Sequence, residues 1–332
     1  PRRPASTVAE PSICVVGTMH MDFIVYTDRL PKPGETVIGR GFEMQPGGKG
    51  ANQAVAAARL GARSSLVSRV GDDYVGRLLL ENAARNGVDT SHVRVDPESH
   101  SGVALIIVGE RGENVIAVAP GVDLRISPGD VEAALPAIRS ADAVLAQLEI
   151  PVETALRAMR LAKQWGRLAI LNPAPAKPLP EDAFSCIDVI TPNVRELEAL
   201  TGASVESVED AVEAAHLLLE RGVGAVVVTM GKRGALVVDG SGSRLVPTFD
   251  VPVVDTVGAG DAFNGALAVA LSLGAPIDEA ATFGNLVASL KVTKRGAQAG
   301  LPRLEEVEKF AEERGARFSF LDRLRRAYPS AP

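Results

Sequence analysis

AVLAQLEIPVETALRAMRLAKQWGRLAIL (residues 143–171) contains a β-like apolar run, a helical segment and a second β-like run. The two runs are 143–147 and 168–171, and the helical segment between them is 154–164. The same alternation continues on both sides, with β-like runs at 13–16, 64–70, 189–191 and 225–229 and helical segments at 52–60, 74–86, 194–200 and 208–221. Strands that alternate with helices predict an α/β fold with a doubly wound, mostly parallel, Rossmann-like sheet.

Two stretches, at 23–44 and 101–119, break this rhythm and have no helices of their own. Both are interpreted as antiparallel strands, the second with a GERGEN turn at 109–114. Together they predict a small β-sheet lid formed by about 23–46 and 101–120. An exposed sheet face of this kind needs a ligand or a partner subunit.

The domain plan that follows is a disordered leader at 1–11, one α/β domain with its lid at 12–316, and a C-terminal tail at 317–332. Within this domain, apolar helices are expected at 258–273 and 277–292, and a charged helix at 304–313.

Composition excludes several classes of function. The net charge of −6 and an aromatic content of 4% argue against a nucleic-acid surface, so small molecules are the expected partners. No apolar run approaches the roughly 20 residues that span a bilayer. Two cysteines in 332 residues make a disulfide framework improbable and favour a reducing compartment. The expected location is therefore the cytoplasm, without contact with a membrane.

DTVGAGDAFNG (residues 255–265) follows a β-like run at 251–254 and enters the first apolar helix. The small residues Gly258, Ala259 and Gly260 expose consecutive backbone N–H groups, which form an anion nest at the helix N-terminus. Asp261 lies at the rim of this nest, where a carboxylate is placed to accept the proton of a hydroxyl that attacks a phosphoryl group. A plain helix N-cap is the alternative for this aspartate.

PGGKGAN (residues 46–52) is a second glycine-rich entry into a helix. Its glycines allow a ligand to approach the backbone closely where free N–H groups favour anions or hydroxyl oxygens. It is not a Walker A loop, because Gly50 follows Lys49 where that motif requires Ser or Thr. A simple turn into a core helix remains an equal alternative.

Asn193 and Glu196 place an amide and a carboxylate three residues apart at a helix start. Such a pair suits Mg²⁺-bound water and phosphate oxygens, but a capping box has the same spacing. The segment 229–234 follows a Val-rich strand and suits either a nucleotide site or, more simply, a hairpin turn.

Glu149 follows a strand, where α/β sheets present ligand-binding side chains, although a solvated Glu is the simpler reading. His20 and Asp22 follow the first strand and are interpreted as a polar pair that contacts substrate. The four histidines show no HExxH spacing and the cysteines no CxxC spacing, which argues against a dedicated metal cage.

These segments, in this order, resemble the ribokinase-like family of carbohydrate kinases from residue 13 to about residue 310. The signature regions are GGKGANQAVAAARLGA (47–62) and DTVGAGDAFNG (255–265); PGET (33–36), GVALI (102–106), GEN (112–114), LNPAPA (171–176), TPN (191–193) and KRGAQ (294–298) are also similar. The resemblance implies transfer of the ATP γ-phosphate to the 5-hydroxyl of ribose, a lid that closes over the sugar, and a homodimer formed through that lid.

The resemblance also implies roles for single residues. Asp261 is the expected base, and Gly258, Ala259 and Gly260 form the anion hole. Sugar contacts are expected from His20, Asp22, Gly48, Lys49, Asn52 and Glu149. Nucleotide contacts are expected from Asn193, Thr229, Gly231, Gly234 and Asn285. Glu196 organises Mg²⁺ through water, and Asp255, Val257 and Gly296 belong to a monovalent cation site that takes K⁺.

Three departures from the family pattern stand out. His20 replaces an asparagine, and an imidazole that changes charge near neutral pH suits a different or an anionic sugar. Lys291 stands where a small residue is usual, and Gly300 replaces a serine, so the hypothesis arises that a lysine ammonium takes the place of K⁺. Asn285 replaces a histidine near the adenine.

Alternatives within and beyond this family remain. Deoxyribose, a sugar phosphate or a nucleoside are other acceptors for the same chemistry, and a catalytically silent sugar- or nucleotide-binding protein is possible because fold does not prove activity. A dehydrogenase is disfavoured, since no GxGxxG follows the first strand, where residues 17–22 read GTMHMD.

Overall fold

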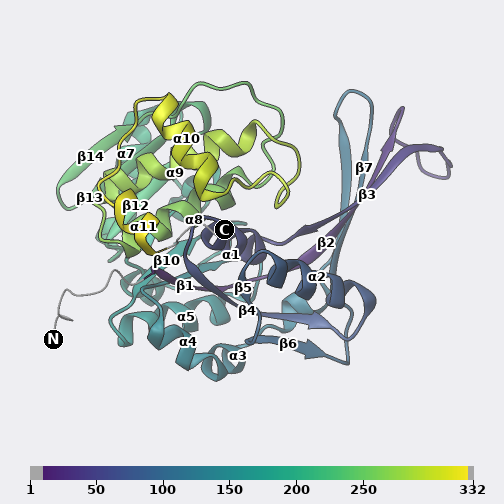
Figure 1. Cartoon of the computed structure of the whole chain (residues 1–332), viewed down its shortest axis with the longest axis horizontal. Helices are drawn as coiled ribbons and strands as arrows, with labels where there is room; N and C mark the ends of the chain where they lie inside the picture. Colours follow the sequence, from purple (N-terminus) through teal and green to yellow (C-terminus); the bar gives the residue numbers. More distant parts are fainter. Residues whose placement is uncertain (1–9, 328–332) are drawn as a thin grey trace.

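The structure, a computed structural model, describes residues 10–327. Most strands of this part of the chain form one ten-stranded sheet, in the order β14-β13-β12-β11-β10-β9-β1-β4-β5, with β6 also paired to β4 (Figure 1). The strands from β12 to β6 pair in parallel, whereas the edge strands β13 and β14 are antiparallel. The predicted α/β fold with a mostly parallel sheet is confirmed.

The strands of this main sheet have the following bounds: β1 Ser12–Val16, β4 Arg63–Gly71, β5 Val88–Asp89, β6 Val93–Asp96, β9 Ala143–Gln147, β10 Leu168–Asn172, β11 Val189–Ile190, β12 Ala225–Thr229, β13 Ala235–Asp239 and β14 Gly242–Val246.

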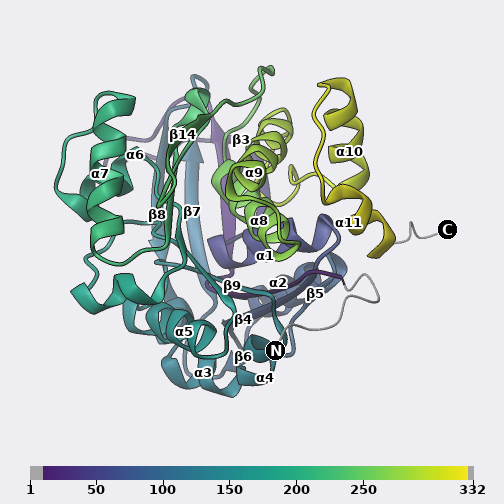
Figure 2. The ribbon, with the colours of Figure 1, turned by 90° about the vertical axis from the view of Figure 1, so that its left-hand side faces the viewer.

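Helices cover both faces of the main sheet, because its strands are apolar on both sides. In β1 the side chains alternate: Ile13 and Val15 enter one core, and Cys14 and Val16 enter the other. Figure 2 shows the two layers of helices with the strands between them. The first core is covered by α1 (Lys49–Arg59), α2 (Tyr74–Arg85), α8 (Ala259–Ser272), α9 (Ile277–Val292), α10 (Leu304–Glu313) and α11 (Leu321–Ala327). The second is covered by α3 (Pro128–Ala133), α4 (Leu135–Ser140), α5 (Val152–Gln164), α6 (Val194–Thr201) and α7 (Val208–Glu220).

Short 3₁₀ turns connect several elements: η1 (Gly121–Arg125), η2 (Glu181–Cys186) and η3 (Gly231–Arg233). Among residues 10–327, no helix is both long and apolar enough to cross a bilayer.

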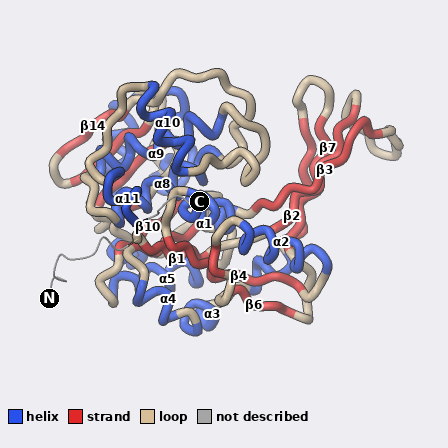
Figure 3. Tube along the Cα trace, in the orientation of Figure 1, coloured by secondary structure: helices blue, strands red, loops and turns tan. Residues whose placement is uncertain are grey.

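A second sheet of four strands projects from this body (Figures 1 and 3). Its order is β3-β2-β7-β8, with bounds β2 His20–Thr27, β3 Gly39–Gly47, β7 Gly102–Val108 and β8 Asn114–Ala119. Large apolar side chains are exposed on it, including Phe42, Leu105 and Val118, each more than half exposed. The outer halves of these strands have no helix beside them in Figure 3.

Each of the two stretches outside the main sheet forms an antiparallel pair as expected, β2 with β3 and β7 with β8. The two pairs join through β2 and β7, which pair in parallel from His20 opposite Gly102 onwards, and this pairing was not predicted. Both strands start at the main body and run outwards, which a hairpin cannot achieve. The run at 251–254 is not a strand: Pro252 has no N–H, and the N–H of Val254 bonds to the Val292 carbonyl instead.

Both ends of the described chain pack against the body. Residues 1–9 of the expected leader lie outside the described part, but Pro11 is buried and its carbonyl accepts a hydrogen bond from the Arg63 N–H. The C-terminal tail, expected from 317 onwards either to dock or to fray, packs into the first core through Phe318, Phe320 and Leu324, as far as residue 327 is described. Residues 328–332 lie outside the described part.

Candidate active site

The candidate residues gather where the parallel strands of the main sheet end. Gln147 ends β9 and Asn172 ends β10, while Thr18 follows β1 and Asn193 follows β11. The carboxyl ends of parallel strands form the usual ligand-binding edge of an α/β sheet. Helices α1 and α8 start at this same edge, so their N-terminal turns face it.

Asp261 is the centre of this site. Its side chain lies in the first turn of α8 and is 6% exposed. Oδ2 accepts a hydrogen bond from Asn52 Nδ2 at 2.8 Å, and Oδ1 accepts one from Gln53 Nε2 at 2.9 Å. Burial raises the pKa of this carboxyl, and the Lys49 charge and the two amide donors oppose that rise. The result is a fixed carboxylate with increased proton affinity, as a general base requires.

The backbone in front of Asp261 has the geometry of an anion site. Gly258 caps α8 in the left-handed region, at φ 77°, and an added Cβ would lie 3.2 Å from Ala297 Cα. The Ala259 N–H, expected to belong to the anion hole, instead bonds to the Thr256 carbonyl. The N–H groups of Gly260 and Asp261 lie in the first helical turn, where no intrahelical acceptor exists, and they are free to bind an anion.

Lys49 places a positive charge among three carboxylates. It is the first residue of α1, after Gly48 at φ 89°, and a Cβ at Gly48 would lie 2.7 Å from Met19 Cα. Burial alone lowers the Lys49 pKa, but the charges of Asp261, Glu149 and Glu196 outweigh it and raise the pKa above its ordinary value. Lys49 therefore stays cationic and balances the negative charge of the site.

Glu149 is held at the entry of α1. Its Oε2 accepts a hydrogen bond from the Lys49 backbone N–H at 2.9 Å and another from the Thr18 hydroxyl. The Asn52 side chain lies one turn further along α1, and its buried Oδ1 has no partner among the described residues. An unpaired buried acceptor is costly, so Asn52 Oδ1 is suited to a ligand hydroxyl.

His20 and Asp22 lie at the base of the small sheet. His20 Nε2 is 3.3 Å from Asp22 Oδ1, and His20 Nδ1 is 3.9 Å from Asp123 Oδ2. Burial lowers the His20 pKa, but the hydrogen bond with Asp22 and the nearby carboxylates outweigh it and raise it. Burial raises the pKa of Asp123 to about 7. A histidine with a raised pKa and an aspartate with a pKa of about 7 therefore lie close together beside Asp22.

Asn193 and Glu196 form the capping box that their spacing allows. The Glu196 N–H donates to Asn193 Oδ1 at 2.9 Å, and the Asn193 N–H donates to Glu196 Oε2 at 2.8 Å. Glu196 also faces the site, since burial raises its pKa and the Lys49 charge opposes this rise. The cap and a role toward a ligand are compatible, because Oε1 is not used by the cap.

The expected nucleotide residues are partly brought together. Thr229 pairs with Asn193 in an isolated parallel bridge, so the ends of β11 and β12 meet. Gly231 and Gly234, at φ 59° and 95°, belong to the turn between β12 and β13, which is an antiparallel hairpin. Asn285 is buried and donates from Nδ2 to the carbonyls of Val246 and Pro247, so its amide holds the end of β14.

The residues expected around a monovalent cation also meet. Asp255 Oδ1 accepts a hydrogen bond from the Val257 N–H at 2.9 Å, and Oδ2 accepts one from the Gly296 N–H at 2.8 Å. The Lys291 ammonium donates to the Asp255 carbonyl at 3.0 Å.

Sequence reasoning missed a buried polar network beneath Asp261. Gln53 is fully buried, and its Nε2 bonds to Asn172 Oδ1 at 3.1 Å as well as to Asp261. Its Oε1 accepts from Gln147 Nε2 at 2.6 Å. The network extends from Asn172 Nδ2 to the Thr191 carbonyl; separately, the Thr191 hydroxyl bonds to Asn264 Oδ1. Polar residues at consecutive strand ends were the available signal.

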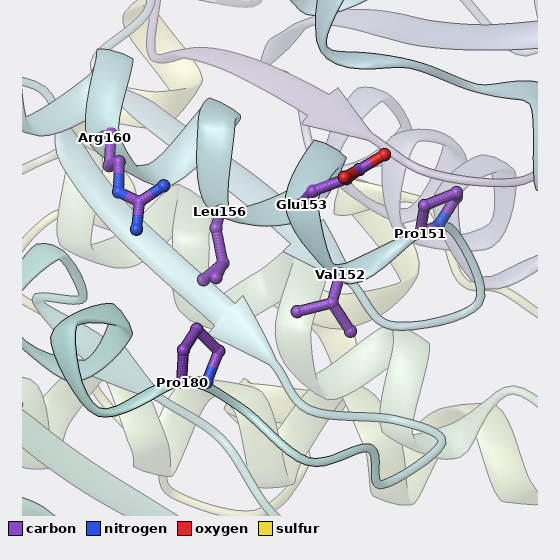
Figure 4. Close-up of a pocket in the computed structure, with 6 residues that line it drawn as sticks. All are labelled: Pro151, Val152, Glu153, Leu156, Arg160 and Pro180. Carbon is purple, nitrogen blue, oxygen red and sulfur yellow. The ribbon is translucent and has the colours of Figure 1, made fainter.

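A surface depression elsewhere contains none of the candidate residues. It is lined by Pro151, Val152, Glu153, Leu156, Arg160 and Pro180, from the start of α5 and the loop before η2 (Figure 4). Its lining is mostly apolar and lacks converging polar groups, in contrast to the strand-end site.

Comparison with known proteins agrees with this geometry. The family model described as "pfkB family carbohydrate kinase" matches residues 10–304 of this chain. A ribokinase of Bacillus subtilis (strain 168) is 43% identical over 297 residues, covering 90% of this chain and 98% of that protein. A deoxyribokinase of Salmonella typhi is 36% identical over 299 residues, covering 90% and 98%. The structure of Arabidopsis thaliana ribokinase complexed with ribose and ATP matches with a TM-score of 0.85 at 32% identity, covering 91% and 98%.

The fold and the strand-end site thus define an ATP-dependent carbohydrate kinase. The small second sheet beside the mostly parallel one is shared with the solved ribokinase structures. This chain belongs to the pfkB family of carbohydrate kinases.

Proposed function

We propose that this chain is a ribokinase, which transfers the γ-phosphate of ATP to the primary 5-hydroxyl of D-ribose. The observation that carries the proposal is the Asp261 carboxylate, fixed by Asn52 and Gln53 directly beside the free N–H groups of α8. A base adjoining an anion hole is what phosphoryl transfer to an alcohol needs. The relatives named ribokinase match over nearly the whole chain and support the choice of sugar.

In the proposed mechanism, Asp261 accepts the proton of the sugar hydroxyl as its oxygen attacks the γ-phosphorus. The new P–O bond forms while the bond from the γ-phosphorus to the bridging oxygen of ADP breaks, and ADP leaves with those electrons. The N–H groups of Gly260 and Asp261, with the dipole of α8, stabilise charge on the transferring phosphoryl group. Lys49 adds positive charge on the side of the sugar.

The remaining sugar contacts come from two parts of the chain. Asp22 and His20 approach from the small sheet, and Asn52 and Glu149 approach from the main body. The unpaired Oδ1 atoms of Asn52 and Asp123 support this assignment, since sugar hydroxyls would satisfy both. Gly48 keeps the backbone close to the sugar, because its positive φ and its contact with Met19 leave no room for a side chain.

On the nucleotide side, Asn193, Thr229 and the turn with Gly231 and Gly234 would line the ATP site. The bridge between Asn193 and Thr229 supports this grouping. Asn285 would lie near the adenine, and its amide holds the end of β14 through the carbonyls of Val246 and Pro247.

Magnesium fits the residues present. Mg²⁺ prefers oxygen ligands and retains several waters, so one carboxylate with the substrate phosphates suffices. Within residues 10–327 no cluster of three or more metal-ligating side chains occurs, which agrees with binding through water and ATP. Glu196 would hold that water through Oε1, and the ion would neutralise charge on the phosphates.

A homodimer and a cytoplasmic location complete the proposal. A second copy would cover the apolar side chains of the small sheet, such as Leu105 and Ile116, which are more than half exposed. The free, buried Cys14 and Cys186 suit a reducing compartment, where ATP is also supplied.

The test is an ATP-turnover screen with Mg²⁺ against ribose, deoxyribose, ribose 1-phosphate, fructose and several nucleosides. Turnover with the highest kcat/KM on ribose supports the proposal. A preference for deoxyribose, the substrate named for one relative, would move the assignment to that sugar and make His20 the specificity determinant. No turnover on any of them would overturn kinase activity in favour of a binding protein.

A further inference from the structure

Lys291 is a lysine without any contact with solvent. It lies in the last turn of α9, is 0% exposed and is among the largest fully buried side chains of residues 10–327. Lysine is rarely buried completely unless its charge is compensated. The acceptor found for its Nζ among the described residues is the Asp255 carbonyl, at 3.0 Å. Such a position calls for a functional explanation.

The ammonium lies where two segments join. The N–H groups of Val254 and Asp255 bond to the Val292 carbonyl, and the Asp255 carboxylate bonds to the N–H groups of Val257 and Gly296. Lys291 adds a bond to the Asp255 carbonyl, the remaining polar group of that residue. The loop that leads into Gly258 and the anion hole is therefore tied at Asp255 to the end of α9 and to the turn that follows this helix.

The stem of Lys291 fills the space at Gly300. A Cβ at Gly300 would lie 3.1 Å from Lys291 Cε, 2.7 Å from the Gly296 carbonyl oxygen and 3.0 Å from the Arg295 carbonyl oxygen. The lysine thus runs past Gly300 toward Asp255, within a pocket of backbone oxygens. Carbonyl oxygens are the ligands that a free alkali cation would use there.

Negative charges lie near the Lys291 ammonium. Burial lowers the Lys291 pKa on balance, and the charges of Asp255 and Asp261 oppose this effect without cancelling it. The C-terminal end of α9 adds the negative pole of a helix dipole, which attracts cations. An ammonium is a compact monovalent charge with directional donors, so it can replace a small metal cation among oxygen acceptors.

The residues here do not fit a bound K⁺. The Asp255 carbonyl, which such an ion would need, already accepts a hydrogen bond from Lys291, and the lysine stem takes up the space beside Gly300. We infer that the Lys291 ammonium is a tethered monovalent cation, which fixes the loop of Asp255 to Gly258 and adds positive potential to the anion hole. Lys291 is a positioning residue, and the enzyme needs no free monovalent cation.

This inference rests on the proposed function, so its test first requires turnover of a sugar by the wild-type chain. Activity is measured in a Tris buffer without alkali cations, and then with NaCl, KCl, NH₄Cl or CsCl at constant ionic strength. The expected wild-type kcat changes by less than about twofold across the series. Activation by K⁺ of about tenfold or more would overturn the inference while leaving the proposed function intact.

The variants are Lys291→Ala and Lys291→Met, with Lys294→Ala as the matched control. Lys294 lies three residues away and pairs with Glu306 on the surface, so its loss removes the same charge without touching the Asp255 loop. We expect Lys291→Ala to lose about tenfold or more in kcat in Tris, with a smaller change in KM. K⁺ or NH₄⁺ should restore a large part of this loss, and Lys294→Ala should behave as the wild type.

Rescue of Lys291→Ala by an added cation distinguishes a role as a positive charge from a purely structural role of the side chain. In Lys291→Ala, K⁺ should also raise the Tm, whereas the wild-type Tm should not respond to exchange of Tris for K⁺. Lys291→Met fills the cavity and should be inactive without responding to cations. A folded Lys291→Ala with full activity in Tris, or one with lost activity that no cation restores, would overturn the inference. The wild-type cation series decides the question even if both variants fail to fold.

Discussion

The ten-stranded sheet is hidden between two layers of helices, whereas the four-stranded sheet leaves β8 exposed along all six of its residues. At the edge of the first sheet, Asp261, Gln53 and Asn172 have their polar atoms joined in a network of short hydrogen bonds. On the second sheet, apolar side chains such as Leu105 and Val118 have no cover in the described chain. The first sheet is thus complete within one chain, while the second is incomplete, with an exposed face that the proposed second copy would cover.

The strongest test of this contrast removes the proposed base, Asp261, from the main sheet's site. Asp261→Asn keeps the shape and the buried position, but the amide cannot accept a proton. We expect kcat to fall about a thousandfold while ATP and sugar still bind. Steady-state kinetics and calorimetric binding measure the two effects, and Asp250→Asn, on the exposed segment that precedes this loop, is the control. Turnover that survived in Asp261→Asn would place the base elsewhere.

The second test breaks the network beneath the base. Gln53→Leu leaves buried atoms of Asp261, Asn172 and Gln147 without partners. The free energy of unfolding should fall by about 2–4 kcal/mol. A lost donor to the charged form also raises the Asp261 pKa further, so the acidic limb of the pH–rate profile should move to higher pH.

Chemical unfolding and a pH series of kcat/KM measure these changes. Gln164→Leu, at the exposed end of α5, is the matched control for the change of side chain. An unchanged acidic limb in a folded Gln53→Leu would separate the network from the chemistry.

The third test addresses the incomplete sheet. A Leu105→Glu/Ile116→Glu double variant places charges at two exposed positions of β7 and β8. We expect a dimer to become a monomer in analytical ultracentrifugation, with the Tm of the main body nearly unchanged and kcat reduced less than by either change above.

Leu217→Glu, on the exposed surface of α7, serves as the control. A wild-type chain that is monomeric at all concentrations would overturn the proposed dimer.

The smallest expected effect is on the pH dependence of stability and concerns Asp123, which lies where the two sheets meet. The pKa of Asp123 is raised by burial to about 7, above its ordinary value of 3.8. The folded state thus binds this proton more tightly than the unfolded state, and stability from this group is lost as pH rises from about 4 to about 7. The Asp123→Asn variant cannot lose stability in this way. The difference between its Tm and the wild-type Tm should therefore increase by about 2–4 °C across that pH range and stay constant above it.

Thermal unfolding at several pH values measures this difference. Glu209→Gln, exposed at the start of α7, should show no such trend. A constant difference between Asp123→Asn and the wild type would mean that Asp123 is ionised throughout.

The ten-stranded sheet and its edge were predicted better from the sequence than the four-stranded sheet. Alternating strands and helices determine a parallel sheet, and motifs at strand ends meet because parallel strands end at one edge. Asp261 and Lys49 were predicted in this way to lie at one site, and the structure brings them close together. The parallel pair of β2 and β7 was missed, because alternation predicts a strand but neither its partner nor its direction.

Prediction from the sequence had a second limit, because a sequence does not show which way a side chain points. Gln53 follows Asn52 directly, yet only its burial against Asn172 and Asp261 reveals that it supports the carboxylate. Lys291 is visible as an unusual residue, but its contact with Asp255 joins positions 36 residues apart. At Asn193 the spacing allowed two interpretations, and the cap formed with Glu196 satisfies one without excluding the other.

Because β2 and β7 are parallel and both start at the body, the small sheet is attached at one end and acts as a lever arm. Both strands are anchored at the body, where His20 lies opposite Gly102, and β2 extends eight residues outwards. At about 3.3 Å per residue this arm is about 26 Å long, so a rotation of about 10° at its base moves the tip by roughly 5 Å. A force on the tip likewise acts through the whole length of the arm on Asp22 and His20, because both lie within two residues of its base. A partner bound at the outer end of this arm would therefore bear on the orientation of Asp22 and His20, the proposed sugar contacts.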